Sequence, residues 1–169
     1  MKIQTLKLVS LFFISTFLFS CAKEDDGIYL NGSSEVVNLN EISSYSTIET
    51  EILKLVNEHR KNMDLNELVC LDIVSNVSKG HTDYMIDAQI MSHDNFSQRT
   101  KILKDKAKAK SVGENVAYGY RSAKGVLNGW LNSATHRAII EKPNYTHFGI
   151  SMESNCDGRY YFTQIFINK

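Results

Sequence analysis

The sequence of 169 residues has little of several features that mark specialised classes of protein. Its three cysteines are too few for a miniprotein held together by disulfide bonds, and its single proline, Pro143, excludes a proline-rich linker. Its 19 basic and 19 acidic residues cancel, so the chain lacks the positive excess of a protein whose whole surface binds nucleic acid. We therefore expect no nucleic-acid partner. The sequence also contains no glycine-rich phosphate loop and no Cys-x-x-Cys zinc pattern.

The N-terminus predicts export and a lipid anchor. A positive start is followed by an apolar run over residues 8–19, which is shorter than the about 20 residues of a membrane-spanning helix and typical of a signal peptide over residues 1–20. The run ends in Leu18-Phe19-Ser20-Cys21, which resembles a bacterial lipobox; the alternative is an ordinary signal peptide with a chance cysteine. We expect lipidation of Cys21, attachment to the membrane through its acyl chains, and a cell-envelope location as an outer-membrane lipoprotein facing either the periplasm or the cell surface. Residues 21–46 are then the lipidated cysteine and a flexible acidic tether.

The folded domain is expected to span residues 47–169, with 43% apolar residues in the chain to supply a core. The four residues from Ser46 have capping-box spacing, and the apolar residues that follow predict a helix over residues 47–63. Further helices are predicted after Asp72 and after Ser122. Alternating residues 148–152, the turn signal Asp157-Gly158 and the β-rich residues 160–167 predict a closing hairpin. Helices followed by a terminal hairpin indicate an α+β domain.

Two of the five histidines are candidates for function. His59 and His81 lie on apolar helix faces and are interpreted as core or supporting residues, and the signal at His147 is weak. His93 and His136 fall instead at breaks in the periodic pattern, where functional groups concentrate.

A glutamate and a basic run complete the set of candidates. Gly113 beside Glu114 and Asn115 predicts a tight backbone conformation that presents the two polar side chains. The basic run over residues 99–110 is interpreted as a solvated helix face, with binding of anionic headgroups or polysaccharide as the alternative.

Five motifs in order together resemble the CAP superfamily (cysteine-rich secretory proteins, antigen 5 and pathogenesis-related proteins; also called the SCP domain), and its bacterial branch in particular. The resemblance covers residues 48–167. The motifs are Leu55-Val56-Asn57-Glu58-His59-Arg60, Met91-Ser92-His93, Gly113-Glu114-Asn115-Val116-Ala117, residues 130–137, and Tyr161-Phe162-Thr163-Gln164-Ile165-Phe166.

The resemblance implies a three-layer α-β-α sandwich with a central antiparallel sheet and a cleft lined by histidines and acids. His93 and Glu114 match two of the four cleft positions that eukaryotic members fill with two histidines and two glutamates. The second glutamate would fall near Ser133 and the last histidine at Tyr161, so eukaryotic sterol or fatty-acid binding transfers poorly. His136 and Arg137 belong to a motif of bacterial members.

The cleft is therefore expected to contain His93, Glu114, Asn115, His136, Arg137 and Tyr161. Two imidazoles and a carboxylate, from His93, His136 and Glu114, suit zinc with an open fourth position. The alternative, which we favour, is a polar network in which Glu114 orients a histidine and no metal is bound. No other cofactor is indicated.

A hydrolase would need a nucleophile, and none is evident. Ser92, Ser133 and Thr135 adjoin the two histidines in sequence but have no nucleophile-elbow motif, so no catalytic residue is assigned. Cys70 and Cys156 are expected to form a disulfide after export, with two free buried thiols as the alternative.

The sequence thus favours a binding or interaction module whose ligand is a lipid, a metal ion or an envelope or host component. A hydrolase that uses the same cleft is the alternative function.

Overall fold

The computed structural model of the chain describes residues 44–169. The predicted signal peptide, Cys21 and all but the end of the predicted tether lie outside the described residues. In chain order the elements are α1 (Thr47–Asn62), β1 (Val69–Cys70), α2 (Asp72–Asp87), α3 (Phe96–Ala107), β2 (Ser111–Tyr118), α4 (Ala123–Asn132), α5 (Ala134–Ile140), β3 (His147–Ser154) and β4 (Tyr160–Asn168).

The first helix begins where the sequence predicts it. The Ser46 side chain accepts a hydrogen bond from the backbone N–H of Glu49, and the Glu49 carboxylate accepts one in return from the Ser46 N–H at 2.8 Å. This reciprocal capping box satisfies N–H groups that the first turn leaves without helical partners. α1 then buries Ile52 and Val56 against the sheet side of the molecule.

The four strands form one sheet in the order β1-β3-β4-β2. β3 and β4 are the predicted antiparallel hairpin, and β2 adds to the other side of β4 in antiparallel register. β1 contributes only two residues, parallel to the start of β3. The sheet is therefore antiparallel except at one short edge.

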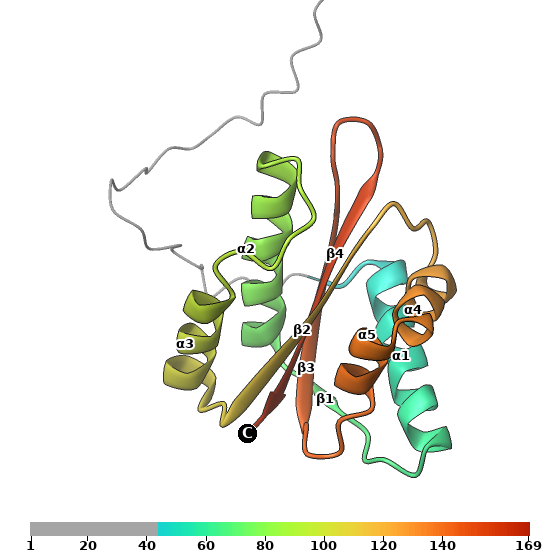
Figure 1. The fold of residues 1–169 in the computed structure, drawn as a ribbon, viewed down its shortest axis with the longest axis vertical. Helices are drawn as coiled ribbons and strands as arrows, with labels where there is room; N and C mark the ends of the chain where they lie inside the picture. The colour runs from blue at the N-terminus through green and yellow to red at the C-terminus, as the bar shows by residue number, and fades with distance from the viewer. Residues whose placement is uncertain (1–43) are drawn as a thin grey trace, which may run out of the picture. The chain divides into compact units, whose positions relative to one another are not determined.

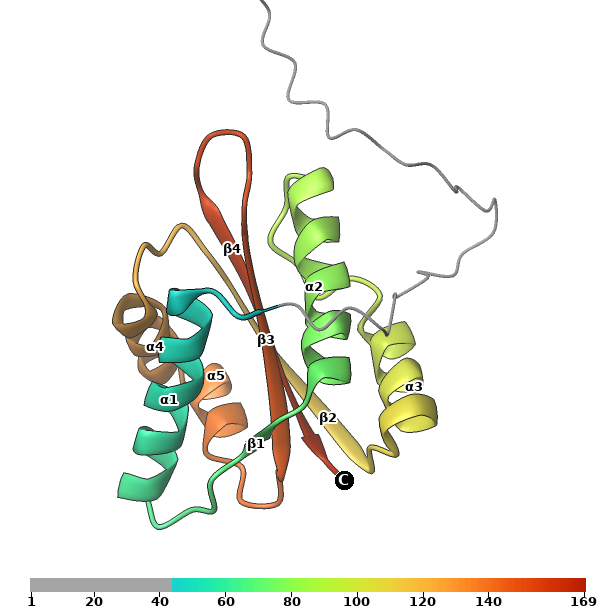
Figure 2. The same ribbon diagram turned by 180° about the vertical axis from the view of Figure 1, so that it is seen from behind.

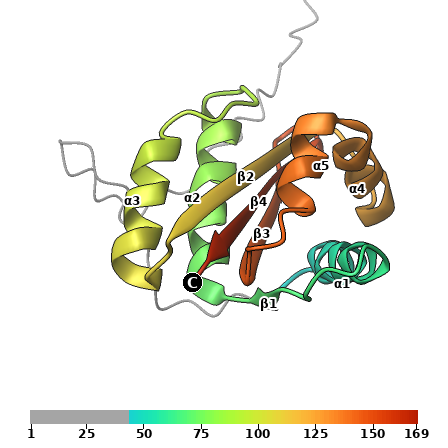
Figure 3. The same cartoon turned by 60° about the horizontal axis from the view of Figure 1, so that its bottom comes forward.

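Helices cover both faces of this sheet, which makes the molecule a three-layer α-β-α sandwich. α2 and α3 lie on one face, and α1, α4 and α5 lie on the other (Figures 1, 2 and 3). The central strand β4 alternates between the two layers: Phe162 and Phe166 pack into the α1 and α4 side, whereas Ile165 and Ile167 pack against α2 and α3. The α+β sandwich expected from the resemblance is confirmed.

Two local expectations are corrected by the structure. Gly113 and the two residues after it lie within β2 rather than in a tight turn, and Gly113 does not have a positive φ. A glycine is needed there because a Cβ would overlap the hydroxyl of buried Tyr145. The basic run is indeed part of a helix, α3, but it is not wholly solvated, since Arg99 is fully buried.

The predicted Cys70–Cys156 disulfide is wrong in this structure, because Cys70 is a free thiol. Cys70 is aligned with Phe148 at the start of β3, whereas Cys156 follows the end of β3 at Ser154. Phe148 and Ser154 are six residues apart on an extended strand, which places them about 20 Å from each other. The Cα atoms of a disulfide lie within about 7 Å, so the two cysteines are too far apart to be bonded. Within residues 44–169, no helix is both long and apolar enough to cross a membrane.

Candidate functional site

The site is built around a buried carboxylate on β2. Glu114 is 4% exposed, and its Oε1 accepts a hydrogen bond from Nδ1 of His93 at 2.8 Å. His93 lies between α2 and α3, and its side chain remains half exposed. Because the carboxylate can only accept, Nδ1 carries a proton, and Nε2 points away from this bond as an acceptor in the neutral ring or a donor in the protonated one.

Arg99 holds the same carboxylate from the other side. Its Nε donates to Oε2 of Glu114 at 2.7 Å, and a terminal nitrogen donates to Oε1 at 2.8 Å. The remaining terminal nitrogen donates to the carbonyl of Asp94 at 2.6 Å, which ties the loop carrying His93 to α3. A bidentate pair of this kind is among the strongest hydrogen-bonded arrangements in proteins.

This network determines the charge of Glu114. Burial alone would raise the pKa of the carboxyl, but the hydrogen bonds from His93 and Arg99 and the charge of Arg99 outweigh it and hold the pKa below its ordinary value. Glu114 is therefore ionised at neutral pH and orients the imidazole of His93.

His81 holds the segment that carries His93 and does not itself contact the cavity. It is fully buried on α2, and its Nε2 donates to the carbonyl of Ser92 at 2.8 Å. Burial, with the nearby charge of Arg99, lowers the pKa of His81 and keeps it neutral. The interpretation of His81 as a core or supporting histidine agrees with this placement. His59 lies elsewhere and pairs with Glu141 at 2.9 Å.

The structure places His136 near this network but not in it. His136 lies on α5, and its carbonyl accepts a hydrogen bond from Nδ2 of Asn115 at 3.2 Å. Burial, together with the proximity of His93, lowers the pKa of the His136 imidazole. Asn115 thus attaches α5 to β2, and its side chain is buried.

The other two predicted cleft residues make different contacts. Arg137 is exposed and donates to the carbonyl of Leu131 at 3.1 Å. Tyr161 is buried and packs on Tyr118 with the ring centroids 4.6 Å apart. Of the six predicted cleft residues, only His93 and Glu114 line the cavity described next.

A cavity of about 390 Å³ opens beside the outer strand β2. Its walls are largely apolar and include the basic groups of His93 and Lys142. The Lys142 amine lies 5.1 Å from the ring centroid of Tyr145. The lining residues are His93, Phe96, Val112, Gly113, Glu114, Ile139, Lys142 and Tyr145.

Arg99 and Lys142 were not predicted as site residues. Arg99 is the one arginine among the lysines of residues 99–110. This difference could have indicated a buried ion pair, because arginine is the cation suited to a buried bidentate pair.

The predicted zinc ligands do not form a metal-binding set. Within residues 44–169, no group of three or more His, Cys, Asp or Glu side chains is arranged to hold a metal ion. Both oxygens of Glu114 are hydrogen-bonded to Arg99, and Oε1 also accepts from His93. A guanidinium so close to the carboxylate competes with any divalent cation, so the donor set fits a polar network and not zinc.

Comparison with known proteins agrees with this architecture. The sequence model of the cysteine-rich secretory protein family (CAP) matches residues 53–166. The uncharacterised membrane protein YlbC of Bacillus subtilis is 33% identical over 129 residues, which are 73% of this chain and 35% of that protein. The chain thus spans about a third of the length of this relative.

Two solved structures share the fold. An outer surface protein from Borrelia burgdorferi superposes with a TM-score of 0.66 at 23% identity, covering 75% of this chain and 96% of that one. An extracellular protein from Bacillus anthracis that contains an SCP domain superposes with a TM-score of 0.62 at 28% identity, covering 72% of this chain and 40% of that one.

Proposed function

Because the chain belongs to the cysteine-rich secretory protein (CAP) family, we propose that it is a cell-envelope binding module whose ligand is an amphiphilic anion held in the cavity beside β2. The observation that carries the proposal is the pairing of apolar walls with two basic groups, His93 and Lys142, in one cavity. Glu114 lines the same cavity, but Arg99 neutralises its charge. The local charge therefore favours an anion.

The walls suit a hydrocarbon chain. Phe96, Val112, Ile139 and Tyr145 would contact the apolar part, which gains roughly 25 cal/mol for each Å² removed from water. The anionic head would accept hydrogen bonds from Lys142 and from the protonated form of His93. Pockets of this type, mostly apolar with a few polar groups that fix orientation, are the usual sites for small ligands.

The proposal is tested by displacement of a fluorescent fatty acid from the full-length chain carrying Cys21→Ser, so that no acyl chain of its own competes. We expect dodecanoate to displace the probe about tenfold better than uncharged dodecanol. Lys142→Gln and His93→Gln should each weaken dodecanoate several-fold and leave dodecanol unchanged. Lys106→Gln, a lysine on exposed α3 surface, is the matched control. Equal affinities for the acid and the alcohol would contradict an anion site.

A hydrolase is the second candidate, and the His93–Glu114 contact favours it. A carboxylate on Nδ1 leaves Nε2 as a base, the arrangement of a general-base histidine. No serine, threonine or cysteine among residues 44–169 lines the cavity, so water would have to be the nucleophile. Turnover of 4-nitrophenyl esters that is lost in His93→Gln and kept in Lys106→Gln would establish this activity. No turnover across a series of acyl lengths would leave the binding function.

The anchor is proposed from the sequence of the N-terminus. Two relatives by sequence or structure are a membrane protein and an extracellular protein, which supports an envelope location. Mass spectrometry of the N-terminal peptide should find acyl chains on Cys21, and Cys21→Ser should move the protein from the membrane fraction to the soluble one. An unmodified Cys21 in a membrane-bound protein would contradict lipidation while leaving the cavity proposal intact.

A further inference from the structure

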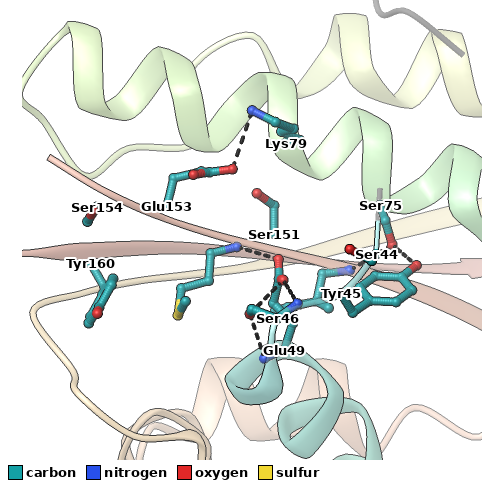
Figure 4. Close-up of a pocket in the computed structure, with 12 residues that line it drawn as sticks. Ser44, Tyr45, Ser46, Glu49, Ser75, Lys79, Ser151, Glu153, Ser154 and Tyr160 are labelled. Carbon is teal, nitrogen blue, oxygen red and sulfur yellow. Dashed lines mark hydrogen bonds and ion pairs between the residues drawn. The ribbon is translucent and has the colours of Figure 1, made fainter. Parts of the chain in front are cut away.

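A second and larger cavity lies at the opposite edge of the sheet from His93. It has a volume of about 460 Å³ and lies beside β3, between the start of α1 and α2 (Figure 4). β1 pairs only with His147 and Phe148, so among the described strands the rest of this edge has no neighbour. The cavity is lined by Ser44, Tyr45, Ser46, Glu49, Ser75, Lys79, Ile150, Ser151, Met152, Glu153, Ser154 and Tyr160.

The backbone N–H groups at the free edge of β3 are already bonded to side chains and cannot pair with an added peptide strand. The N–H of Ile150 donates to Oγ of Ser75 at 3.2 Å, and the N–H of Met152 donates to Oε1 of Glu49 at 2.9 Å. A peptide that paired with this edge would need those two donors for its own carbonyls. Side chains that occupy them protect the edge from strand addition, so the ligand of this cavity is not an extended peptide.

The serine at the centre of the cavity has an unused hydroxyl. Ser151 is only 3% exposed, it lines the cavity, and its Oγ has no hydrogen-bond partner among residues 44–169. Figure 4 shows the hydroxyl between Ser75 and the Lys79–Glu153 pair, without a bond to either. A hydroxyl that lines a cavity without a protein partner is expected to bond to water or to a ligand there.

The charges that line this cavity disfavour an anionic ligand. Lys79 donates to Asp83 at 2.8 Å and lies 3.4 Å from Glu153, so its charge is already compensated. Burial would lower the pKa of Lys79, but the bonds to these acids outweigh it and raise the pKa, which keeps the amine charged. Two carboxylates, from Glu49 and Glu153, line the cavity together with this one amine. The excess is negative, and an anionic ligand is therefore disfavoured.

The remaining groups are those that recognise a polyhydroxylated molecule. The hydroxyls of Ser44, Ser151, Ser154 and Tyr160 can each donate and accept, and Glu153 can accept from a ligand O–H. The ring of Tyr160 offers a flat apolar surface to the C–H face of a sugar. We propose that this cavity is a saccharide-binding site that takes an uncharged sugar unit, separate from the cavity beside β2.

The test uses the full-length chain carrying Cys21→Ser and two probes that differ by one carboxylate, glucose and glucuronate, with N-acetylglucosamine as a third. Titration is followed by ¹⁵N–¹H NMR. We expect saturable shifts from glucose or N-acetylglucosamine at residues 150–154 and 75–79, and weaker binding of glucuronate. Ser151→Ala should weaken the neutral sugar about two- to tenfold, the range for loss of one neutral hydrogen bond.

The controls separate this site from the one beside β2. Ser97→Ala, an exposed serine on α3, should leave sugar binding unchanged. His93→Gln and Lys142→Gln should also leave it unchanged, and Ser151→Ala should not alter binding of dodecanoate. Shifts that map elsewhere, glucuronate binding at least as tightly as glucose, no saturable binding of either neutral sugar, or a Ser151→Ala variant that binds normally would each overturn the proposal.

Discussion

Arg99 and Glu114 form a buried bidentate ion pair that joins α3 to β2, with N–O distances of 2.7 and 2.8 Å. Neither side chain is exposed beyond 1%. The pair does two things at once: it keeps Glu114 ionised so that His93 is oriented, and it occupies both carboxylate oxygens with hydrogen bonds. The site is thus organised around a neutralised charge.

Removing one partner of this pair should strongly destabilise the protein. Arg99→Met leaves Glu114 buried without its cation, and we expect a loss of about 3–5 kcal/mol in the free energy of unfolding, measured by urea denaturation. The double variant Arg99→Met, Glu114→Leu should recover part of this loss because no charge remains buried. Lys101→Met, which breaks an exposed pair on the same helix, should leave the unfolding midpoint unchanged. A loss in Lys101→Met equal to that in Arg99→Met would contradict the assignment.

Low pH should destabilise the folded protein by protonating the carboxylate of Glu114. The pKa of Glu114 is below its ordinary value in the folded protein, so its contribution to stability is fully present above the ordinary glutamate pKa of about 4.3 and is lost as the pH falls through the lowered value. The free energy of unfolding should therefore fall more steeply below pH about 4.3 in the natural protein than in Glu114→Gln. Denaturation at closely spaced pH values measures both slopes. Equal slopes would mean that Glu114 titrates alike in the folded and unfolded chains.

The sequence predicted elements where periodicity or capping was strong. α1, α2, α4 and the hairpin agree with the helical spacing after Ser46, Asp72 and Ser122 and with the alternation around Asp157-Gly158. The sequence did not predict β2 as a strand, because helices cover both faces of the sheet at this position. Gly113 to Ala117 are therefore all buried and show no alternation of apolar and polar residues. The bacterial CAP resemblance supplied the layer order that local patterns could not.

The candidate site was predictable only in part. His93 and Glu114 are 21 residues apart, and only the resemblance indicated that they meet. Arg99 was hidden in a lysine-rich run, since composition alone does not show which cation of a helix faces inward. The resemblance places Arg137 in the same bacterial motif as His136, yet successive helix residues point in different directions, and Arg137 faces solvent.

Cys70 should react slowly with alkylating agents despite being a free thiol. Burial raises its pKa, so less thiolate is present at pH 7 than for an ordinary cysteine. Alkylation by iodoacetamide, followed by mass spectrometry of the Cys70 peptide, should be slower than in a matched variant with Val69→Cys and Cys70→Ser. Position 69 is on the same strand and is 60% exposed. A Cys70–Cys156 linked peptide in a non-reducing digest would instead restore the disulfide that the sequence suggested.

Gly113→Ala tests how closely the α5–β3 connection packs on β2. The added methyl would overlap the hydroxyl of Tyr145, which is 2% exposed, and it would also crowd Ile139. We expect a loss of about 1–3 kcal/mol, as for other overpacked cores. Tyr145→Phe in the same chain removes the overlapping oxygen and should recover part of that loss.

Gly119→Ala is the control, because glycine is required there for its backbone conformation and not for space. Position 119 is open and has a φ of 81°, so the loss of stability in Gly119→Ala would come from the backbone alone, and Tyr145→Phe should not reduce it. Thermal and urea unfolding of the natural protein, of Gly113→Ala and Tyr145→Phe separately and of their double variant gives the coupling between positions 113 and 145, and a coupling near zero would show that Tyr145 moves aside.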